Sequence, residues 1–341
     1  MNYKKENFQK EGLSKAGFFR GWAFMGWAIV FSVVALYFFT ASRDSEEMIQ
    51  DEEPVVFTFN VSPDLPTSID FCGQEIDLTR YQIHEGIDRE LSVFTYFHSS
   101  TMLLIKRANR YFPVIEPILK TNNIPDDFKY LAVIESNLDP KIVSPARAVG
   151  IWQLMEGTGK NFGLQITATV DERRHVAKST EAACKYLREA YNKYGDWVTV
   201  AISYNAGMGR MSEQLAKQKE TSPLNLHFVE ETIRYPYRIF AAKLIFENPY
   251  KYGFVLHAGN LYAPIACDEA VVEHDIADLA DFAVEKGITY FDLKFFNPWL
   301  SDTKLITGGK KYTLLIPHKD KIYYRSSNTY VHDKRWIIQA H

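Results

Sequence analysis

The sequence predicts a mainly α-helical protein with a transmembrane helix near its N-terminus and a small α+β region at its C-terminus. Three observations lead to this prediction. Residues 21–41 carry no charge, amphipathic segments with helical spacing recur between residues 78 and 248, and the pattern changes after that point. The length of 341 residues is enough for one large domain or two smaller ones with a sizeable core.

Composition and charge exclude several classes of function. The net charge of -3 provides no basic surface of the kind that binds nucleic acid, so no nucleic-acid partner is expected. No cysteine pair or histidine cluster has the spacing of zinc ligands, so no metal is expected.

The three cysteines are Cys72, Cys184 and Cys267. Cys72 and Cys267 lie outside the expected helices and could pair in an oxidising compartment; the alternative is buried free thiols.

The N-terminal residues predict a membrane anchor. Residues 1–20 form a basic tail, and the uncharged stretch 21–41 has close to the ~20 residues that cross a bilayer. Because the positive flank precedes the span, we expect a single pass of the cytoplasmic membrane with the remaining chain on the periplasmic side. A cleaved signal peptide is the alternative, but its apolar core is usually only ~7–15 residues long. Residues 42–77 are expected to be a linker with a short extended segment at 55–59.

The segment from 78 to 122 is expected to form one or two supporting helices without chemistry of their own. Apolar side chains recur along it at helical spacing. His98 lies beside this stripe and is interpreted as a surface or packing residue. The residues that share the expected buried face are Leu91, Phe94, Phe97, Leu104, Ile105 and Ala108.

Apolar spacing predicts three further helices between residues 181 and 246. Glycine, which tolerates a left-handed backbone, marks two of the helix ends, at Gly195 and Gly207. The expected helices span 181–194, 197–204 and 230–246. After Asn248, the C-terminal region 249–341 is expected to contain helices at 276–286 and 290–296 and a strand at 312–317.

Glu135 is the candidate catalytic residue. Pro125, followed by two aspartates, predicts a helix start, and Phe128, Leu131 and Glu135 then fall at i, i+3 and i+7. The carboxylate therefore continues an apolar face, where burial should raise its pKa. A raised pKa suits a general acid near neutral pH. The alternative is a structural glutamate paired with an arginine or capped by amides.

Three motifs in order make the chain resemble the lysozyme-like lytic transglycosylases, and most closely their membrane-bound D type. They are Glu135-Ser136, Gly150-Ile151-Trp152-Gln153 and Tyr204-Asn205-Ala206-Gly207. The resemblance covers about Leu78 to Phe246. It implies a mainly helical, lysozyme-like catalytic domain of the goose-type or SLT class over residues 78–248. It also implies that the substrate is the glycan strand of peptidoglycan.

The resemblance implies a reaction that uses one carboxyl group and no cofactor. Such enzymes cleave the β-1,4 bond between N-acetylmuramic acid and N-acetylglucosamine and leave a 1,6-anhydro-muramoyl end. Glu135 would first protonate the leaving oxygen and then accept the proton of the sugar's C6 hydroxyl. A retaining hydrolase would instead need a second carboxylate nearby. Asp139 lies four residues on, but Pro140 indicates that the helix has ended and favours a loop role.

The resemblance also assigns substrate-binding residues. Ser144, Gln153, Tyr204 and Asn205 would position Glu135 and the sugars, with Tyr204 contacting Glu135 in particular. Trp152 is expected to pack in the core rather than to stack on a sugar. The other expected groove residues are Ser136 within the first motif, Met155 and Ser203 near the cleaved bond, and Glu231 and Tyr235 on the far wall.

The sequence departs from the family pattern at a few positions. Arg147 stands where the loop usually has a glycine, Ser203 replaces a common alanine, and Glu156-Gly157 replaces a proline-containing pair. These changes concern specificity near the cleaved bond rather than the acid itself.

The C-terminal region resembles a LysM peptidoglycan-binding module without its usual Gly-Asp-Thr opening. A packing domain on the catalytic core is the alternative. For the whole chain, the alternatives to a lytic transglycosylase are a muramidase, a non-catalytic peptidoglycan-binding scaffold and a chitin-type hydrolase.

Overall fold

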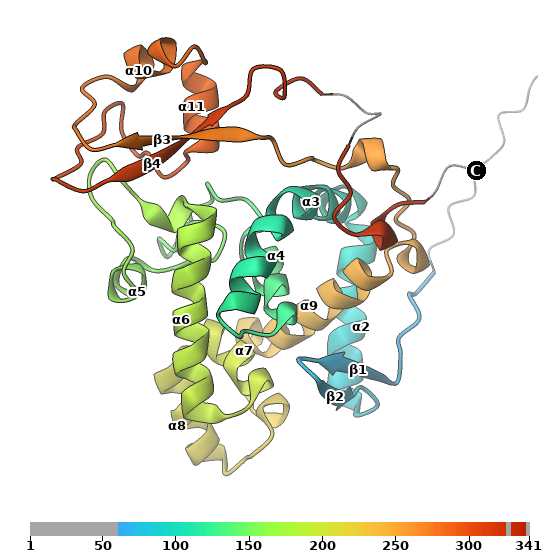
Figure 1. The fold of residues 1–341 in the computed structure, drawn as a ribbon. Helices are drawn as coiled ribbons and strands as arrows, with labels where there is room; N and C mark the ends of the chain where they lie inside the picture. The colour runs from blue at the N-terminus through green and yellow to red at the C-terminus, as the bar shows by residue number, and fades with distance from the viewer. Residues whose placement is uncertain (1–60, 325–328, 339–341) are drawn as a thin grey trace, which may run out of the picture. The chain divides into compact units, whose positions relative to one another are not determined.

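The computed structural model describes residues 61–324 and 329–338 (Figure 1). The predicted basic tail 1–20, the membrane span 21–41 and the extended segment 55–59 lie outside the described residues. Among the residues that are described, no helix combines the length and the apolar character that crossing a membrane requires.

A β-hairpin occupies the end of the segment that the sequence predicts to be a linker. Strands β1 (Ser68–Phe71) and β2 (Gln74–Asp77) pair antiparallel, with Phe71 opposite Gln74. The two turn residues, Cys72 and Gly73, both have positive φ, at 57° and 80°, as a type I′ hairpin turn requires. Phe71 is fully buried in the main core. Cys72 is a free thiol, as is Cys267, so these two cysteines form no disulfide.

Two helices follow, as the sequence predicts. Helix α2 covers Tyr81–Tyr96 and helix α3 covers His98–Thr121. The prediction is wrong for Phe97, which is 64% exposed because it is the junction residue between the two helices rather than part of a buried face. His98 begins α3 and is exposed, which fits a surface role.

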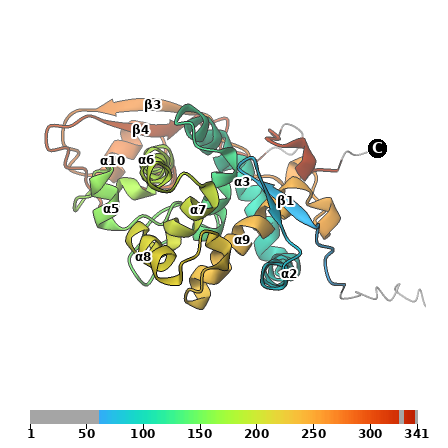
Figure 2. The same cartoon turned by 90° about the horizontal axis from the view of Figure 1, so that it is seen from below.

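The helical region is built around two short, buried helices, α4 and α7, and Figure 2 shows α7 among α6, α8 and α9. Helix α4 packs against α3 and α9, and α7 packs against α6, α8 and α9. Because neither central helix has a solvent face along most of its length, residues at their ends are held firmly by the surrounding core. The bounds are α4 Lys129–Ser136, α5 Glu156–Asn161, α6 Val176–Tyr194, α7 Trp197–Ala206, α8 Met208–Gln218 and α9 Glu230–Glu247. Short 3-10 helices lie at Asp126–Phe128, Glu172–Arg174, Pro223–Asn225, Tyr250–Tyr252, Ala258–Asn260 and Lys334–Trp336.

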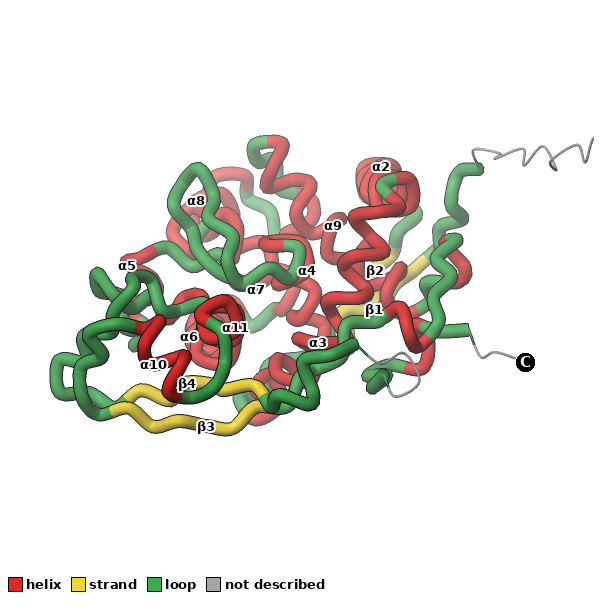
Figure 3. Tube along the Cα trace, turned by 90° about the horizontal axis from the view of Figure 1, so that it is seen from above, coloured by secondary structure: helices red, strands yellow, loops and turns green. Residues whose placement is uncertain are grey.

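The C-terminal part has its own small core. Strands β3 (Cys267–Val272) and β4 (Tyr312–Pro317) pair antiparallel, and Figure 3 shows them side by side. Helix α11 (Tyr290–Phe296) packs on β4, and α10 (Leu279–Glu285) packs on α11. Helix α10 begins later than predicted because the Asp278 side chain caps it. The fully buried members of this second core include Leu279, Ala283, Leu293, Leu305 and Leu314.

Backbone hydrogen bonds join the two cores. The amide of Asp171 donates to the carbonyl of Trp299 at 2.8 Å, and the amide of Ser301 donates to the carbonyl of Thr169 at 3.0 Å. The last described residues, 329–338, then return to the helical core and form what we call the C-terminal strap. Its Trp336 is buried in the main core, beside residues of α3 and α9.

Candidate active site

Glu135 lies in the last turn of α4, directly before the helix ends. Asn137 and Leu138 both take left-handed backbone conformations, with φ of 53° and 55°, and turn the chain away. Two arginines from neighbouring helices hold this end. Arg238 donates to the carbonyl of Ile134 at 3.0 Å, and Arg107 donates to the carbonyl of Asn137 at 2.8 Å. The carboxyl group is thus fixed at the edge of the core and stays partly exposed.

The surroundings of Glu135 confirm the prediction of a raised pKa. Burial raises the pKa of its carboxyl from 4.5 to about 7. The Tyr235 hydroxyl, which donates to Glu135 Oε1 at 2.6 Å, and the positive charge of Arg238 both lower this pKa. The negative charge of Glu231 raises it. A carboxyl group with a pKa near 7 can both give and take a proton at neutral pH, which suits an acid–base catalyst.

Replacing Tyr235 with phenylalanine should move the pH dependence of Glu135 to higher pH. The lost hydrogen bond favours the ionised carboxylate, so its removal raises the pKa of Glu135 further. For a reaction that begins with the protonated acid, kcat/KM falls as pH rises through that pKa, near 7 in the parent. The pH profile of kcat/KM checks this: an alkaline limb that stays in place, or moves to lower pH, would contradict it.

Tyr204 makes no hydrogen bond to Glu135, although the sequence predicts a contact and burial together with the negative charge of Glu135 raises the pKa of Tyr204. Its hydroxyl donates to the carbonyl of Trp152 at 2.7 Å, and its ring packs edge-on against Tyr186 at 5.3 Å. The phenol that reaches the carboxylate comes from Tyr235 on α9 instead. The hydrogen bond of Tyr204 ties α7 to the loop that carries Gln153.

That loop, residues 142–154, is folded on itself by short β-bridges between Val143 and Val149 and between Val149 and Leu154. The Ser144 hydroxyl accepts from the amide of Ala148 at 3.0 Å, and Gln153 Nε2 donates to the carbonyl of Gly150 at 2.8 Å. Both side chains therefore shape the loop, and neither bonds to Glu135 in the structure. Arg147 has a φ of 65°, the left-handed conformation that explains why a glycine suits this position.

Gly150 and Arg173 together fix the position of this loop. A Cβ on Gly150 would lie 1.9 Å from the carbonyl oxygen of Arg173, and its φ is +85°. The buried guanidinium of Arg173 is paired with Asp171 at 2.8 Å. It also donates to the carbonyls of Arg147 at 3.3 Å and Leu154 at 3.2 Å. Sequence patterns assign no role to this arginine, and a buried ion pair next to a signature glycine is visible only in the fold.

Replacing Gly150 with alanine should reduce activity by about 10²-fold. The new methyl group would overlap backbone atoms of Arg173, so the loop must move away, and a displacement of about 1 Å near a reaction centre costs that much. Gly157 is a matched control, because a Cβ there meets nothing within 4 Å and its φ is not left-handed. Turnover of purified cell wall by the two variants measures the difference; equal loss would contradict the role given to Gly150.

Two predicted groove residues are buried and serve the protein interior instead. Ser136 is 1% exposed, and its hydroxyl donates to the carbonyl of Ile151 at 2.8 Å. Ser203 is fully buried, and its hydroxyl donates to the carbonyl of Val200 at 2.8 Å. The structure therefore places both hydroxyls in the core rather than in a groove, where each is satisfied by a backbone carbonyl.

The remaining predicted residues have the expected accessibility. Met155 is 46% exposed and Glu231 is exposed. Asn205 accepts from the hydroxyl of Thr232 at 2.8 Å, which joins the end of α7 to the start of α9. The predicted core role of Trp152 is confirmed, since its ring is fully buried and its indole nitrogen donates to Thr180 at 2.8 Å.

Asp139 has the loop role that the sequence favours. Its carboxylate accepts from the amide of Lys141 at 2.9 Å and shapes the turn after α4. Within residues 61–324 and 329–338, acidic, histidine and cysteine side chains form no group that could hold a metal ion.

Two parts of the chain match known protein families. Residues 112–226 match the family model "Transglycosylase SLT domain", and residues 268–320 match "Soluble lytic transglycosylase C-terminal LysM-like domain". The chain is 31% identical over 265 residues to the membrane-bound lytic murein transglycosylase D of Escherichia coli strain K12. That alignment covers 75% of this chain but only 57% of the relative.

The chain also aligns in part with two solved lytic transglycosylase structures. The 70 kDa soluble lytic transglycosylase of Escherichia coli aligns at 18% identity with a TM-score of 0.38, over 52% of this chain and 34% of that one. An inactive mutant of lytic transglycosylase Slt from Pseudomonas aeruginosa aligns at 21% identity with a TM-score of 0.33, over 40% and 24%. The family-model matches show that this chain contains a transglycosylase SLT domain followed by a LysM-like domain.

Proposed function

We propose that the protein is a lytic transglycosylase that acts on the glycan strands of peptidoglycan. The observation that carries this proposal is Glu135, a largely buried carboxyl group with a pKa of about 7 at the end of α4, within the SLT domain. The curated relative is named as a lytic murein transglycosylase, which supports the same activity here.

Glu135 works alone in this proposal. Its protonated form donates to the leaving glycosidic oxygen, and the resulting carboxylate takes the proton of the muramic acid C6 hydroxyl as the 1,6-anhydro ring closes. Tyr235 holds the carboxyl in place during both steps through its 2.6 Å hydrogen bond. Asp139 is engaged with the backbone of its own loop, which disfavours a role as nucleophile.

The masses of the products test the proposal directly. Purified peptidoglycan is digested with the full chain, and the released muropeptides are measured by mass spectrometry. We expect 1,6-anhydro ends, each lighter by one water than the hydrolysis product. Reducing ends alone would identify a muramidase, and binding without any release would identify a scaffold. Turnover of chitooligosaccharides in place of peptidoglycan would identify a chitin-type hydrolase.

We further propose that residues 21–41 anchor the enzyme in the cytoplasmic membrane with the SLT domain outside the cytoplasm. The uncharged stretch and its basic flank support this location, as does the membrane-bound relative. Extraction of cell membranes at alkaline pH tests it: an anchored chain stays with the lipid, whereas release into the soluble fraction would show that the stretch does not hold it there.

A further inference from the structure

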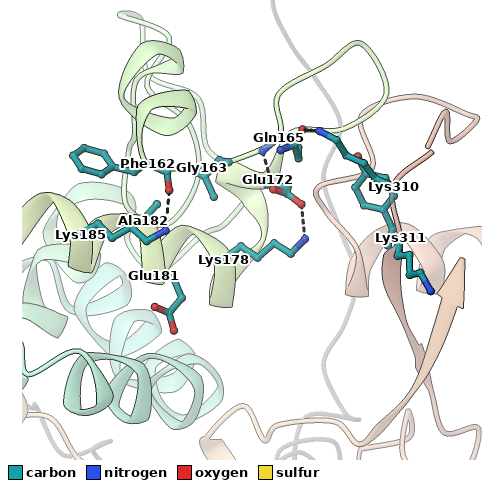
Figure 4. Close-up of a pocket in the computed structure, with 12 residues that line it drawn as sticks. Phe162, Gly163, Gln165, Glu172, Lys178, Glu181, Ala182, Lys185, Lys310 and Lys311 are labelled. Carbon is teal, nitrogen blue, oxygen red and sulfur yellow. Dashed lines mark hydrogen bonds and ion pairs between the residues drawn. The ribbon is translucent and has the colours of Figure 1, made fainter. Parts of the chain in front are cut away.

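A cavity of about 280 Å³ opens where the SLT domain meets the LysM-like domain (Figure 4). Residues 162–165 and helix α6 supply its SLT side, and residues 310–312 at the start of β4 supply its LysM-like side. None of these residues belongs to the site around Glu135. The cavity is lined by four lysines, Lys178, Lys185, Lys310 and Lys311.

The lining carries a positive charge after its internal pairs are counted. Its acidic members are Glu172 and Glu181, and Lys311 is paired at 2.6 Å with Glu273 outside the lining, which leaves one positive charge in excess. Glu172 is buried and fully engaged: one oxygen accepts from Lys178 at 2.5 Å and the other from the amide of Gln165 at 2.7 Å. Glu181 accepts from the Asn122 side chain at 2.9 Å. Each carboxylate thus accepts at least one hydrogen bond from the protein.

Two of the ammonium groups are held by neutral partners. Lys185 donates to the carbonyl of Phe162 at 3.2 Å, and Lys310 donates to the side-chain oxygen of Gln165. Figure 4 shows both ammonium groups directed toward the stretch 162–165, one from each domain. An ammonium group has three donors, so each retains hydrogen-bonding capacity and an unneutralised charge for an anion.

We propose that this cavity binds a carboxylate of the peptide stems attached to the glycan strand. The inference rests on the proposed function, because that function defines the substrate. The glycan backbone of such a strand is uncharged where stems are attached, so its carboxylates lie on the peptides. Met155 is a residue that the resemblance places near the cleaved bond. Helix α5 leads from it to the wall of the cavity in six residues, about 9 Å of helix. A stem of three extended residues spans a similar length.

The test compares the binding of three soluble ligands to the full chain carrying Glu135→Gln, which keeps them intact. The ligands are glycan strands with free stems, strands whose stem carboxylates are converted to carboxamides, and strands stripped of their stems. We expect the free-stem strands to bind most tightly. Lys185→Gln combined with Lys310→Gln should weaken their binding about threefold to tenfold and leave the other two ligands unaffected.

A matched control removes the same charge elsewhere. Lys217 and Lys304 are exposed, one in each domain, and neither lines the cavity. Lys217→Gln combined with Lys304→Gln should leave all three affinities unchanged. Equal loss in the control pair, or equally tight binding of the carboxamide strands, would overturn the carboxylate site.

Failure of this proposal is distinguishable from failure of the proposed function. The variant with both Lys185→Gln and Lys310→Gln could bind the free-stem strands as tightly as the parent. If the unmutated chain still releases anhydro muropeptides in that case, only the cavity assignment is wrong. If the unmutated chain releases none, the proposed function is wrong. Cleavage of stem-free strands should be the same for the parent and the Lys185 and Lys310 double variant, because neither lysine lies in the site around Glu135.

Discussion

Replacing Glu135 with glutamine should lower the rate of peptidoglycan cleavage by about 10²- to 10⁴-fold, the range that a general acid or base contributes. Glutamine keeps the shape of the side chain and can still meet the Tyr235 hydroxyl, but it has no proton to give and cannot accept one. Both proposed steps use this one carboxyl, so no second residue compensates. The rate of release of anhydro muropeptides measures the effect.

Asp139→Asn is the matched control, since it removes the carboxylate that lies four residues after Glu135. Its carboxylate bonds to the amide of Lys141, and the asparagine side-chain oxygen can keep that bond. We expect nearly full activity from this variant. A Glu135→Gln variant that cleaves as fast as the parent would show that another residue is the acid.

A stability measurement separates lost chemistry from lost folding. The pKa of Glu135 in the folded chain, about 7, lies above its ordinary value of 4.5. The native state therefore binds more protons between these two values, and its free energy of unfolding falls as pH rises from 4.5 to about 7. Glutamine cannot ionise, so the variant should melt no lower than the parent at pH 8. A lower melting temperature there would mean that the substitution also destabilises the fold.

Local sequence patterns predict much of the fold and the acid itself. The apolar spacing that ends at Glu135 describes a real helix, α4, and the glycine at 195 ends α6 in the left-handed conformation that the pattern requires. These features depend on neighbours within one or two turns, so the chain reveals them directly.

Contacts between distant segments are not visible in such patterns. Tyr204 and Tyr235 are both tyrosines of helical segments, and only the packing of α7 and α9 decides that Tyr235 reaches Glu135. Ser203 is a similar case. A serine that bonds to the carbonyl of Val200, three residues earlier, can satisfy its hydroxyl inside a core, so its position in a motif does not place it in a groove.

The strands are less visible in the sequence than the helices for a physical reason. The sequence of β3, Cys267–Val272, includes Asp268 and Glu269 and has no clear alternation of apolar residues. One face of its two-stranded sheet is open to solvent, so the strand is defined by its pairing with β4 rather than by its own composition. The hairpin of β1 and β2 likewise follows a Pro-, Thr- and Ser-rich stretch typical of linkers, and Phe71 becomes a core residue only through its contacts with Phe128 and Phe240.

The C-terminal strap leads to the second large expected effect: Trp336→Ala should lower the free energy of unfolding by about 3–5 kcal/mol. Trp336 is only 3% exposed and packs edge-on against Phe112 at 5.8 Å and Phe246 at 5.7 Å. Its indole nitrogen also donates to the carbonyl of Phe246 at 2.9 Å, so alanine would leave both a cavity and an unpaired carbonyl.

The strap follows the LysM-like domain in the chain and packs on the helical core. The loss of stability should therefore extend beyond Trp336 itself. Asn109, buried in α3, bonds to the strap at the carbonyl of Tyr330 (2.7 Å) and the amide of His332 (2.8 Å). Without the Trp336 anchor, these bonds are exposed to water and the strap should open. Amide hydrogen exchange should then be faster throughout residues 329–338, and the melting temperature should fall by about 10 °C. Lys334→Ala, an exposed change in the same strap, should alter neither. An unchanged melting temperature for Trp336→Ala would show that the strap does not stabilise the helical core.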